Sequence, residues 1–138
     1  MNQIMALDVG TKTIGLAIGR LDARLPQPLM TIHRKSVAKD VTRLMEICQK
    51  YHISQAVVGL PLMLDGTEGR SAKLARQIGE ALGSRANIAI HYQDERFSTV
   101  QAEKKLRELG KSYKKRKQQI DQAAAAVILE SWFFEQPT

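Results

Sequence analysis

The order of local patterns along this 138-residue chain predicts a layered α/β domain. Two short β-type runs come first, and helical and strand patterns alternate after residue 36. Strands that are separated by helices favour parallel pairing, so we expect the later strands to be parallel. The length is sufficient to bury a real core, and we expect one domain over residues 1–138.

The first nineteen residues hold two apolar runs with only a few residues between them. Gly10, Thr11, Lys12 and Thr13 separate the runs, which predicts a tight hairpin. The first run ends at Asp8. An unpaired carboxylate in a buried strand is costly, and a bound cation is the simplest way to stabilise it. Asp8 is therefore the first candidate site residue.

A loop and an edge strand are expected before the first helix. Pro26 and Pro28 indicate a loop over residues 20–28, and weak alternation over 29–33 predicts a third strand at an edge. Ser36 is a good helix N-cap. The apolar residues that follow recur on one helical face, and they are Val37, Val41, Leu44, Met45, Cys48 and Tyr51. Their spacing assigns Cys48 to the core.

The middle of the chain predicts a strand, a helix and another strand. Residues 55–61 are rich in β-branched side chains and end at a proline, which is typical of a buried parallel strand. A helix is expected from about residue 68 or 71 to Leu82, with Gly83 ending it. The next strand covers residues 87–92.

The last third of the chain predicts two helices. Ser98 and Gln101 form a capping box for a helix over 99–109. A final helix should begin near Gln119 or Ile120. Its residues 123–129 are all apolar, so we expect that helix to be buried, with Trp132, Phe133 and Phe134 as its packing end.

Positive charge is concentrated between these two helices. The chain has 21 lysines and arginines against 14 acids, and the segment 111–117 holds five of the cations and no acid. Such a segment is expected either to contact phosphates or to be a solvated loop. No apolar run reaches membrane-spanning length, and the start of the chain lacks a signal-peptide pattern. With a single cysteine, we expect a cytoplasmic protein without membrane contact.

Acidic residues stand at three places where structure alone does not require them. Asp8 ends the first strand, Asp94 and Glu95 follow the last strand, and Asp121 comes just before the apolar helix. Sites in such sheets lie beyond the carboxyl ends of strands. If the last helix packs on the sheet, Asp121 approaches Asp8 and Glu95. Other interpretations remain open, namely a helix cap for Asp121 and a surface network with Arg96 for the acids beside it.

Carboxylates at close range repel one another unless a divalent cation neutralises them. Mg²⁺ or Mn²⁺ suits an all-oxygen set of ligands, and two ions about 4 Å apart can support phosphodiester cleavage. Zinc is not expected, because the histidines are far apart and lack ligand spacing.

Four motifs in order then resemble a known family. They are Asp8-Val-Gly-Thr-Lys-Thr-Ile-Gly-Leu-Ala, Val58-Gly-Leu-Pro-Leu-Met-Leu-Asp-Gly-Thr67, Asp94-Glu-Arg-Phe-Ser-Thr-Val-Gln-Ala102 and Asp121-Gln-Ala-Ala-Ala-Ala. They are similar to the YqgF (RuvX) family of RuvC-like nucleases, regarded first as Holliday junction resolvases and later as pre-16S rRNA nucleases. The resemblance implies a ribonuclease H-like fold, with a mixed central sheet, helices on both faces and a metal-dependent acidic site.

The resemblance also implies roles for individual residues. Asp8, Glu95 and Asp121 match the catalytic, metal-binding triad, and Asp94 is a possible auxiliary. Basic positions expected to meet nucleic acid are Lys12, Arg96, Lys114, Lys115, Arg116 and Lys117, the last four as a cationic loop beside the metals. Met63 departs from the asparagine that the family often has, so it is given no role.

The leading hypothesis is a metal-dependent endonuclease that processes the 5′ end of pre-16S rRNA, with ribosomal particles as possible partners. Resolution of four-way DNA junctions is the enzymatic alternative and requires a dimer for paired cuts. A non-catalytic RNA-binding or ribosome-assembly factor is a third. An ATP-binding module of the sugar-kinase and actin type is set aside, because it needs two domains and 138 residues are too few.

Overall fold

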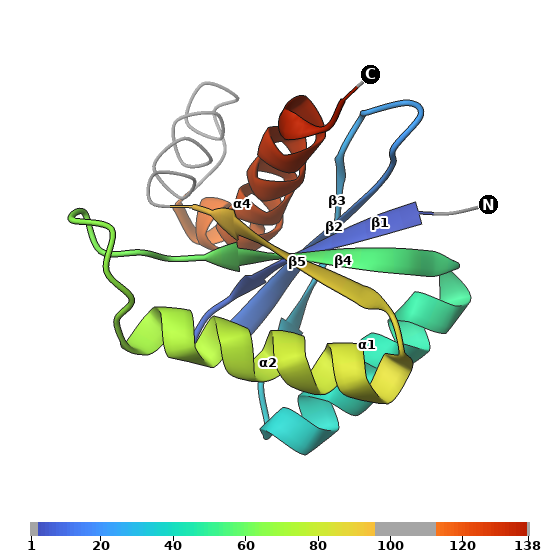
Figure 1. Cartoon of the computed structure of the whole chain (residues 1–138). Coiled ribbons are helices and arrows are strands. Elements are labelled where there is room, and N and C mark those ends of the chain that lie inside the picture. The colour runs from blue at the N-terminus through green and yellow to red at the C-terminus, as the bar shows by residue number, and fades with distance from the viewer. Residues whose placement is uncertain (1–2, 96–112, 138) are drawn as a thin grey trace.

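The computed structural model describes residues 3–95 and 113–137, with the backbone alone for 113–119. Five strands form one sheet in the order β3-β2-β1-β4-β5. Helices α1 and α2 cover one face of the sheet and α4 covers the other (Figure 1). The elements are β1 Gln3–Val9, β2 Thr13–Arg20, β3 Gln27–His33, α1 Val37–Lys50, β4 Ile53–Leu60, α2 Arg70–Ala86, β5 Ala89–Asp94 and α4 Tyr113–Glu135.

The pairing of the strands is mixed, as the sequence predicts. β1, β2 and β3 form an antiparallel meander, and β4 and β5 add to the other side of β1 in parallel. The carboxyl ends of β1, β4 and β5 therefore lie at one edge of the sheet. The turn between β1 and β2 lies at the same edge, because it follows the end of β1 directly.

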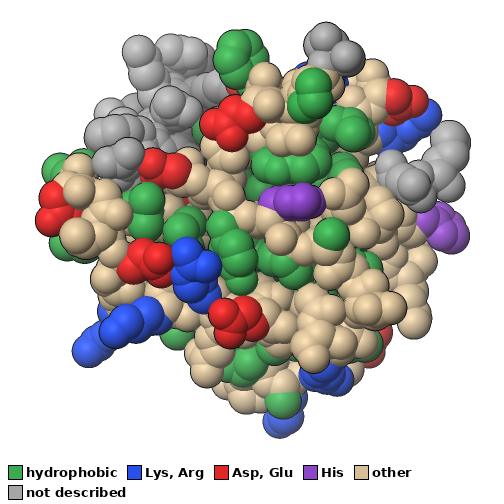
Figure 2. Space-filling model, in the orientation of Figure 1, with side chains coloured by type: hydrophobic (Ala, Val, Ile, Leu, Met, Phe, Trp, Pro, Cys, Tyr) green, Lys and Arg blue, Asp and Glu red, His purple; other side chains and the backbone are tan. Residues whose placement is uncertain are grey.

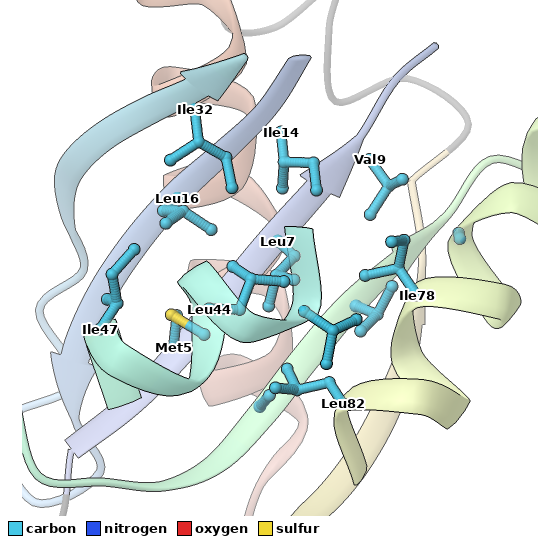
Figure 3. Close-up of a cluster of buried hydrophobic side chains, with 14 of the residues drawn as sticks. Met5, Leu7, Val9, Ile14, Leu16, Ile32, Leu44, Ile47, Ile78 and Leu82 are labelled. Atoms are coloured by element: carbon cyan, nitrogen blue, oxygen red, sulfur yellow. The ribbon is translucent and has the colours of Figure 1, made fainter. Parts of the chain in front are cut away.

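The larger core lies between the sheet and helices α1 and α2. Alternate residues of β1 and β2 face it, and Figure 3 shows Leu7, Val9 and Ile14 pointing from the sheet toward Leu44 of α1 and Ile78 of α2. All five of these side chains are buried. Strand periodicity therefore assigns these large apolar side chains to one face of the sheet.

The opposite face of the sheet is lined by small residues, which lets α4 pack closely. Ala6 of β1 and Ala17 of β2 lie in this second cluster, beneath Ile128 and Leu129 of α4. The helix buries one apolar residue after another over its middle turns, in agreement with the prediction from residues 123–129. The resulting layer order is helices, sheet, helix.

The first helix begins where the sequence predicts. Ser36 adopts an extended backbone, and its side chain accepts a hydrogen bond from the backbone N–H of Lys39. Cys48 is buried on the predicted apolar face. Burial raises the pKa of its thiol to about 11, so the core assignment is confirmed.

Helix α2 continues beyond its predicted end. Gly83 lies inside the helix, where a side chain would come within 2.7 Å of Ile90 in β5, so close packing rather than termination requires glycine there. Asn87 ends the helix instead, with a left-handed backbone at φ 55°. Asparagine tolerates this conformation better than most residues.

The start of α4 is the main error of the prediction. The helix begins at Tyr113, earlier than the expected Gln119 or Ile120. Its first turns therefore contain Lys114, Lys115, Arg116 and Lys117, which were predicted to form a loop. A helix there carries no apolar stripe in residues 114–119, so periodicity could not reveal it. The predicted helix over 99–109 lies outside the described residues.

The aromatic end of α4 packs only in part. Trp132 and Phe133 are buried, but Phe134 is 89% exposed. Trp132 also stacks obliquely on His91 of β5, with ring centroids 5.1 Å apart. The prediction holds for the first two aromatic residues and is wrong for the third. In the part of the chain that the structure describes, no helix is both long and apolar enough to span a bilayer.

Candidate active site

Asp8 lies on the face of the sheet that α4 covers. Ile4 and Ala6 contribute to the α4 cluster, and Asp8 is the next residue of the same parity in β1. Its partner across the β1–β2 ladder is Gly15. The carboxylate is thus placed at the end of β1, over a neighbour that has no side chain.

Glu95 is brought to Asp8 by β5. It follows the last residue of that strand, its backbone N–H donates to the carbonyl of Leu60 at 3.2 Å, and it is only 8% exposed. A hydrogen-bonding interaction links the side chains of Asp8 and Glu95 and favours the charged form of Asp8. Two of the three predicted acids are therefore in direct contact.

Gly59 makes the space that Glu95 occupies. A β-carbon on Gly59 would lie 2.7 Å from Oε2 of Glu95 and 2.5 Å from Cδ1 of Ile128. Any larger residue at this position would therefore press on both the Glu95 carboxylate and α4. This role of Gly59 depends on contacts with α4 and with the end of β5, so no local sequence pattern reveals it.

Asp121 approaches the same edge from α4. Its backbone passes so close to Gly15 that a β-carbon there would clash with the carbonyl oxygen of Asp121. Directly paired residues of antiparallel strands have β-carbons about 5 Å apart. Since Gly15 is the partner of Asp8, Asp121 is a close neighbour of Asp8. Asp121 lies inside the helix, so the helix-cap interpretation is wrong.

Thr13 fixes the orientation of Asp121. Its hydroxyl Oγ1 donates to Oδ2 of Asp121 at 2.5 Å. Thr13 is the first residue of β2 and follows the turn that begins after Asp8 and Val9. The hydrogen bond therefore ties the hairpin that carries Asp8 to the helix that carries Asp121.

Burial has the largest effect on the charge of Asp8. The pKa of Asp8 is raised from 3.8 to about 6, first by burial and further by the charge of Asp121, while the hydrogen bond to Glu95 opposes the rise. A carboxylate with this environment gains from a nearby cation, which would stabilise its charged form.

The donor chemistry of the three acids fits a hard divalent cation, but their side chains do not form a ready-made metal site. Carboxylate oxygens are the ligands that Mg²⁺ and Mn²⁺ prefer. Within residues 3–95 and 113–137, however, no three His, Cys, Asp or Glu side chains are grouped closely enough to hold a metal ion. One oxygen of Asp121 is bound to Thr13, and Asp8 is bound to Glu95.

A buried ion pair holds the turn between β1 and β2. Nη1 of Arg34 donates to the carbonyl of Gly10 at 3.0 Å, and the backbone N–H of Arg34 donates to the carbonyl of Lys12 at 2.8 Å. The guanidinium is itself paired with Asp40 through Nε, at 3.0 Å. Asp40 is 3% exposed and also accepts from the backbone N–H of Lys35. Sequence reasoning missed this pair, since neither residue belongs to a recognisable motif.

The remaining predicted residues are placed unevenly. Lys12 is exposed in the β1–β2 turn, beside the acids. Asp94 is exposed as the last residue of β5, whereas Glu95 is buried. Arg96 lies outside the described residues. Met63 is exposed in the connection between β4 and α2, where its carbonyl accepts from the backbone N–H of Gly66.

Comparison with known proteins places this chain among nucleases. The family model described as "RuvX: Holliday junction resolvase" matches residues 2–135. A protein of Anaeromyxobacter sp. (strain K) named "Putative pre-16S rRNA nuclease" is 39% identical over 128 residues, covering 93% of each chain. A protein of the same name from Caldanaerobacter subterraneus subsp. tengcongensis is 40% identical over 135 residues and 97% of each chain.

Solved structures agree on the fold. Thermus thermophilus RuvC in complex with a Holliday junction superposes with a TM-score of 0.58 at 15% identity, and the match covers 97% of this chain and 94% of RuvC. At that identity the likeness concerns the fold alone, which is the predicted ribonuclease H-like arrangement. The identity to the curated relatives extends over nine-tenths of the chain, and together with the family match it shows that the chain belongs to the RuvX family.

Proposed function

We propose that this protein is a divalent-metal-dependent endonuclease that cleaves structured RNA and processes the 5′ end of pre-16S rRNA. The names of the relatives support the substrate. The observation that carries the proposal is the convergence of Asp8, Glu95 and Asp121, which come from β1, the end of β5 and α4. A purely structural domain has no need to bring three carboxylates together, because their mutual repulsion is destabilising.

In this proposal Asp8, Glu95 and Asp121 hold Mg²⁺ or Mn²⁺, with two ions when substrate is bound. Such ions supply an activated water and stabilise the leaving oxygen. The three carboxylates would set the position at which the scissile phosphate must lie. Thr13 orients Asp121, and the contact of Arg34 with Gly10 holds the turn that follows Asp8.

Basic residues next to the acids would bind the substrate backbone. Lys12 is exposed at the turn that follows β1 and is suited to contact a phosphate near the cut. Lys114, Lys115, Arg116 and Lys117 precede Asp121 on the same helix and are assigned the same role. Arg96 follows Glu95 in the chain and is assigned the same role. Each phosphate that is neutralised adds salt-dependent affinity.

The compartment and the partners follow from the substrate. Pre-16S rRNA matures on ribosomal particles, which makes these the proposed partners, and the lone buried Cys48 suits a reducing cytoplasm. Junction DNA is the rival substrate, because the family description and the RuvC likeness both refer to it. Paired cuts in a junction require a dimer, so the oligomeric state in solution discriminates between the two.

The test compares cleavage of pre-16S leader RNA and four-way junction DNA, each with Mg²⁺ and with Mn²⁺. Wild type should cleave the RNA at one position, and Asp8→Asn should reduce the rate by at least 10³-fold while RNA binding persists. Asp22→Asn, at an exposed site paired with Arg20, is the matched control and should cleave normally. Equal cleavage by Asp8→Asn and wild type would exclude this site. RNA binding by a wild type that never cleaves would favour the assembly-factor alternative.

A further inference from the structure

A second candidate site lies on the face of the sheet opposite α4. It is a cavity of about 720 Å³ between the end of β3, the first turns of α1 and the end of α2. We call it the cationic cavity. Its lining is Thr31, Ile32, His33, Lys35, Ala38, Lys39, Asp40, Thr42, Arg43 and Arg85. Because α1 and α2 pack on the opposite face of the sheet from α4, this lining is separate from the proposed catalytic acids.

The charge of the cavity is strongly positive. Lys35, Lys39, Arg43 and Arg85 contribute four permanent cations. The one acid in the lining is Asp40, and both of its carboxylate oxygens already accept hydrogen bonds, from Arg34 and from the backbone of Lys35. The four cations in the lining are thus not neutralised by any acid in the lining.

One arginine is held in position at the wall. Arg85 reaches from α2 to α1, where Nη1 donates to the carbonyl of Ala38 at 3.0 Å and Nη2 donates to Oγ1 of Thr42 at 2.9 Å. A guanidinium has five N–H donors, so these two bonds fix its plane and leave donors for a ligand. A fixed arginine fork is well suited to phosphate oxygens.

The spacing of the other cations has a cost that an anion would offset. Lys39 and Arg43 are four residues apart on α1, and Lys35 lies just before that helix, which begins at Val37. Like charges at this spacing destabilise a helix by a few tenths of a kcal/mol per pair. A row of cations on one helical face is favourable when phosphates lie along it.

We infer that the cationic cavity binds backbone phosphates of the nucleic acid, as a second contact surface on the opposite face of the sheet from Asp8 and Glu95. The inference rests on the proposed function for the identity of the ligand. It assigns His33, Lys35, Lys39, Arg43 and Arg85 to substrate binding, none of which belongs to the motifs that define the catalytic acids. A substrate that reaches both surfaces must cross the edge of the sheet where β3 ends and β2 begins, at which His33 is paired with Thr13.

The experiment compares a variant that loses two positive charges from the cavity with a control variant that loses two positive charges elsewhere. On the face seen in Figure 2, basic side chains gather in the lower half, over α1 and α2, so loss of any two cations should weaken RNA binding somewhat. Lys39→Gln with Arg43→Gln is the cavity variant. Lys50→Gln with Lys73→Gln is the matched control, at exposed positions of α1 and α2 that lie outside the cavity. Lys39→Arg with Arg43→Lys keeps both charges.

Binding of pre-16S leader RNA is measured in EDTA over a range of salt concentrations, so that cleavage plays no part. The cavity variant should bind about 10-fold more weakly near 0.1 M salt, with a salt slope smaller by about 1.5 to 2, which corresponds to two lost phosphate contacts. The control should change by less than 3-fold, and the charge-preserving variant should bind as wild type does. Thermal unfolding midpoints should agree for all the variants.

A second arm separates nucleic-acid phosphate from free phosphate. Inorganic phosphate is titrated while the NMR signals of the His33 ring and the Arg85 side chain are followed. Shifts at those residues with displacement of RNA support the inference. It is overturned if phosphate binds but the cavity variant retains full RNA affinity, or if both double variants lose affinity equally. Failure of wild type to cleave RNA would refute the proposed function and leave this binding result standing.

Discussion

Thr13 and Asp121 are 108 positions apart in the sequence, yet Oγ1 of Thr13 donates a 2.5 Å hydrogen bond to Oδ2 of Asp121. The bond joins the first residue of β2 to the interior of α4. It lies at the point where the helix crosses the hairpin that carries Asp8. The orientation of one proposed metal ligand therefore depends on a hydroxyl outside the acidic triad.

Replacing Thr13 by valine should reduce cleavage with little loss of RNA binding. Thr13→Val keeps the shape of the side chain but removes the donor, so Asp121 loses its partner and its orientation. We expect kcat to fall about 10-fold and the free energy of unfolding to fall by about 1–2 kcal/mol. Single-turnover cleavage and denaturant unfolding measure the two effects.

Thr13→Ser is the control for this prediction, because it restores the hydroxyl without the methyl group. It should recover most of the lost rate, although a serine costs a little packing. If Thr13→Val and wild type cleave at the same rate, the hydrogen bond does not position a group that matters for catalysis.

Two glycines beneath α4 should tolerate alanine to different extents. At Gly15 the added methyl would meet backbone atoms of Asp121, which cannot move without displacing the helix. At Gly59 it would meet the ends of the Glu95 and Ile128 side chains, which can rotate. We expect Gly15→Ala to lower the free energy of unfolding by more than about 3 kcal/mol and Gly59→Ala by about 1–3 kcal/mol.

Gly69→Ala provides a matched control for both substitutions. A β-carbon there would find its nearest neighbour, Sδ of Met63, at 3.4 Å, which is an ordinary contact. This change should cost less than about 1 kcal/mol. Chemical denaturation gives the order directly, and an equal cost at all three glycines would contradict the close approach of α4 to the sheet.

The acids at strand ends could be found from the sequence because their position follows from local patterns. Asp8 ends an apolar run and Glu95 comes directly after a predicted strand, so parallel pairing alone brings them to one edge. The hydrogen bond between their side chains agrees with that reasoning. The helix face of α1 and the cap at Ser36 followed from periodicity and capping rules in the same way.

What the sequence did not reveal depends on contacts between distant segments. The first turns of α4 carry polar and basic residues, so they lack the apolar stripe that indicates a helix, and the prediction began too late. The roles of Gly15 and Gly59 appear only when α4 is laid on the sheet. The same holds for Arg34, whose partners Gly10 and Asp40 are set by tertiary packing.

Asp8 should make the protein less stable as pH rises in the absence of divalent cations. Its folded pKa of about 6 exceeds the ordinary 3.8, so between these values the folded state binds more protons than the unfolded state. The free energy of unfolding should therefore fall between about pH 4 and pH 6, by up to about 3 kcal/mol. Thermal unfolding in EDTA across this pH range measures the slope.

Asp8→Asn should remove this dependence. The variant should unfold several degrees above wild type at pH 7.5 in EDTA, and the two should differ little at pH 4. Adding Mg²⁺ or Mn²⁺ at pH 7.5 should raise the midpoint of wild type and leave the variant nearly unchanged. If neither ion changes the unfolding midpoint of wild type, that result would argue against coordination by the Asp8 carboxylate.

Replacing both members of the Arg34–Asp40 ion pair by apolar residues should impair cleavage more than it lowers the free energy of unfolding. Arg34→Met leaves Asp40 charged and buried and removes the donor to Gly10, so we expect a loss of about 3–5 kcal/mol. Arg34→Met with Asp40→Leu removes both charges and should recover a large part of that loss. Cleavage should stay impaired in the double variant, because the turn after Asp8 still lacks its contact. Full recovery of cleavage together with stability would mean that the arginine serves the fold alone, and a double-mutant cycle on unfolding and on kcat separates the two outcomes.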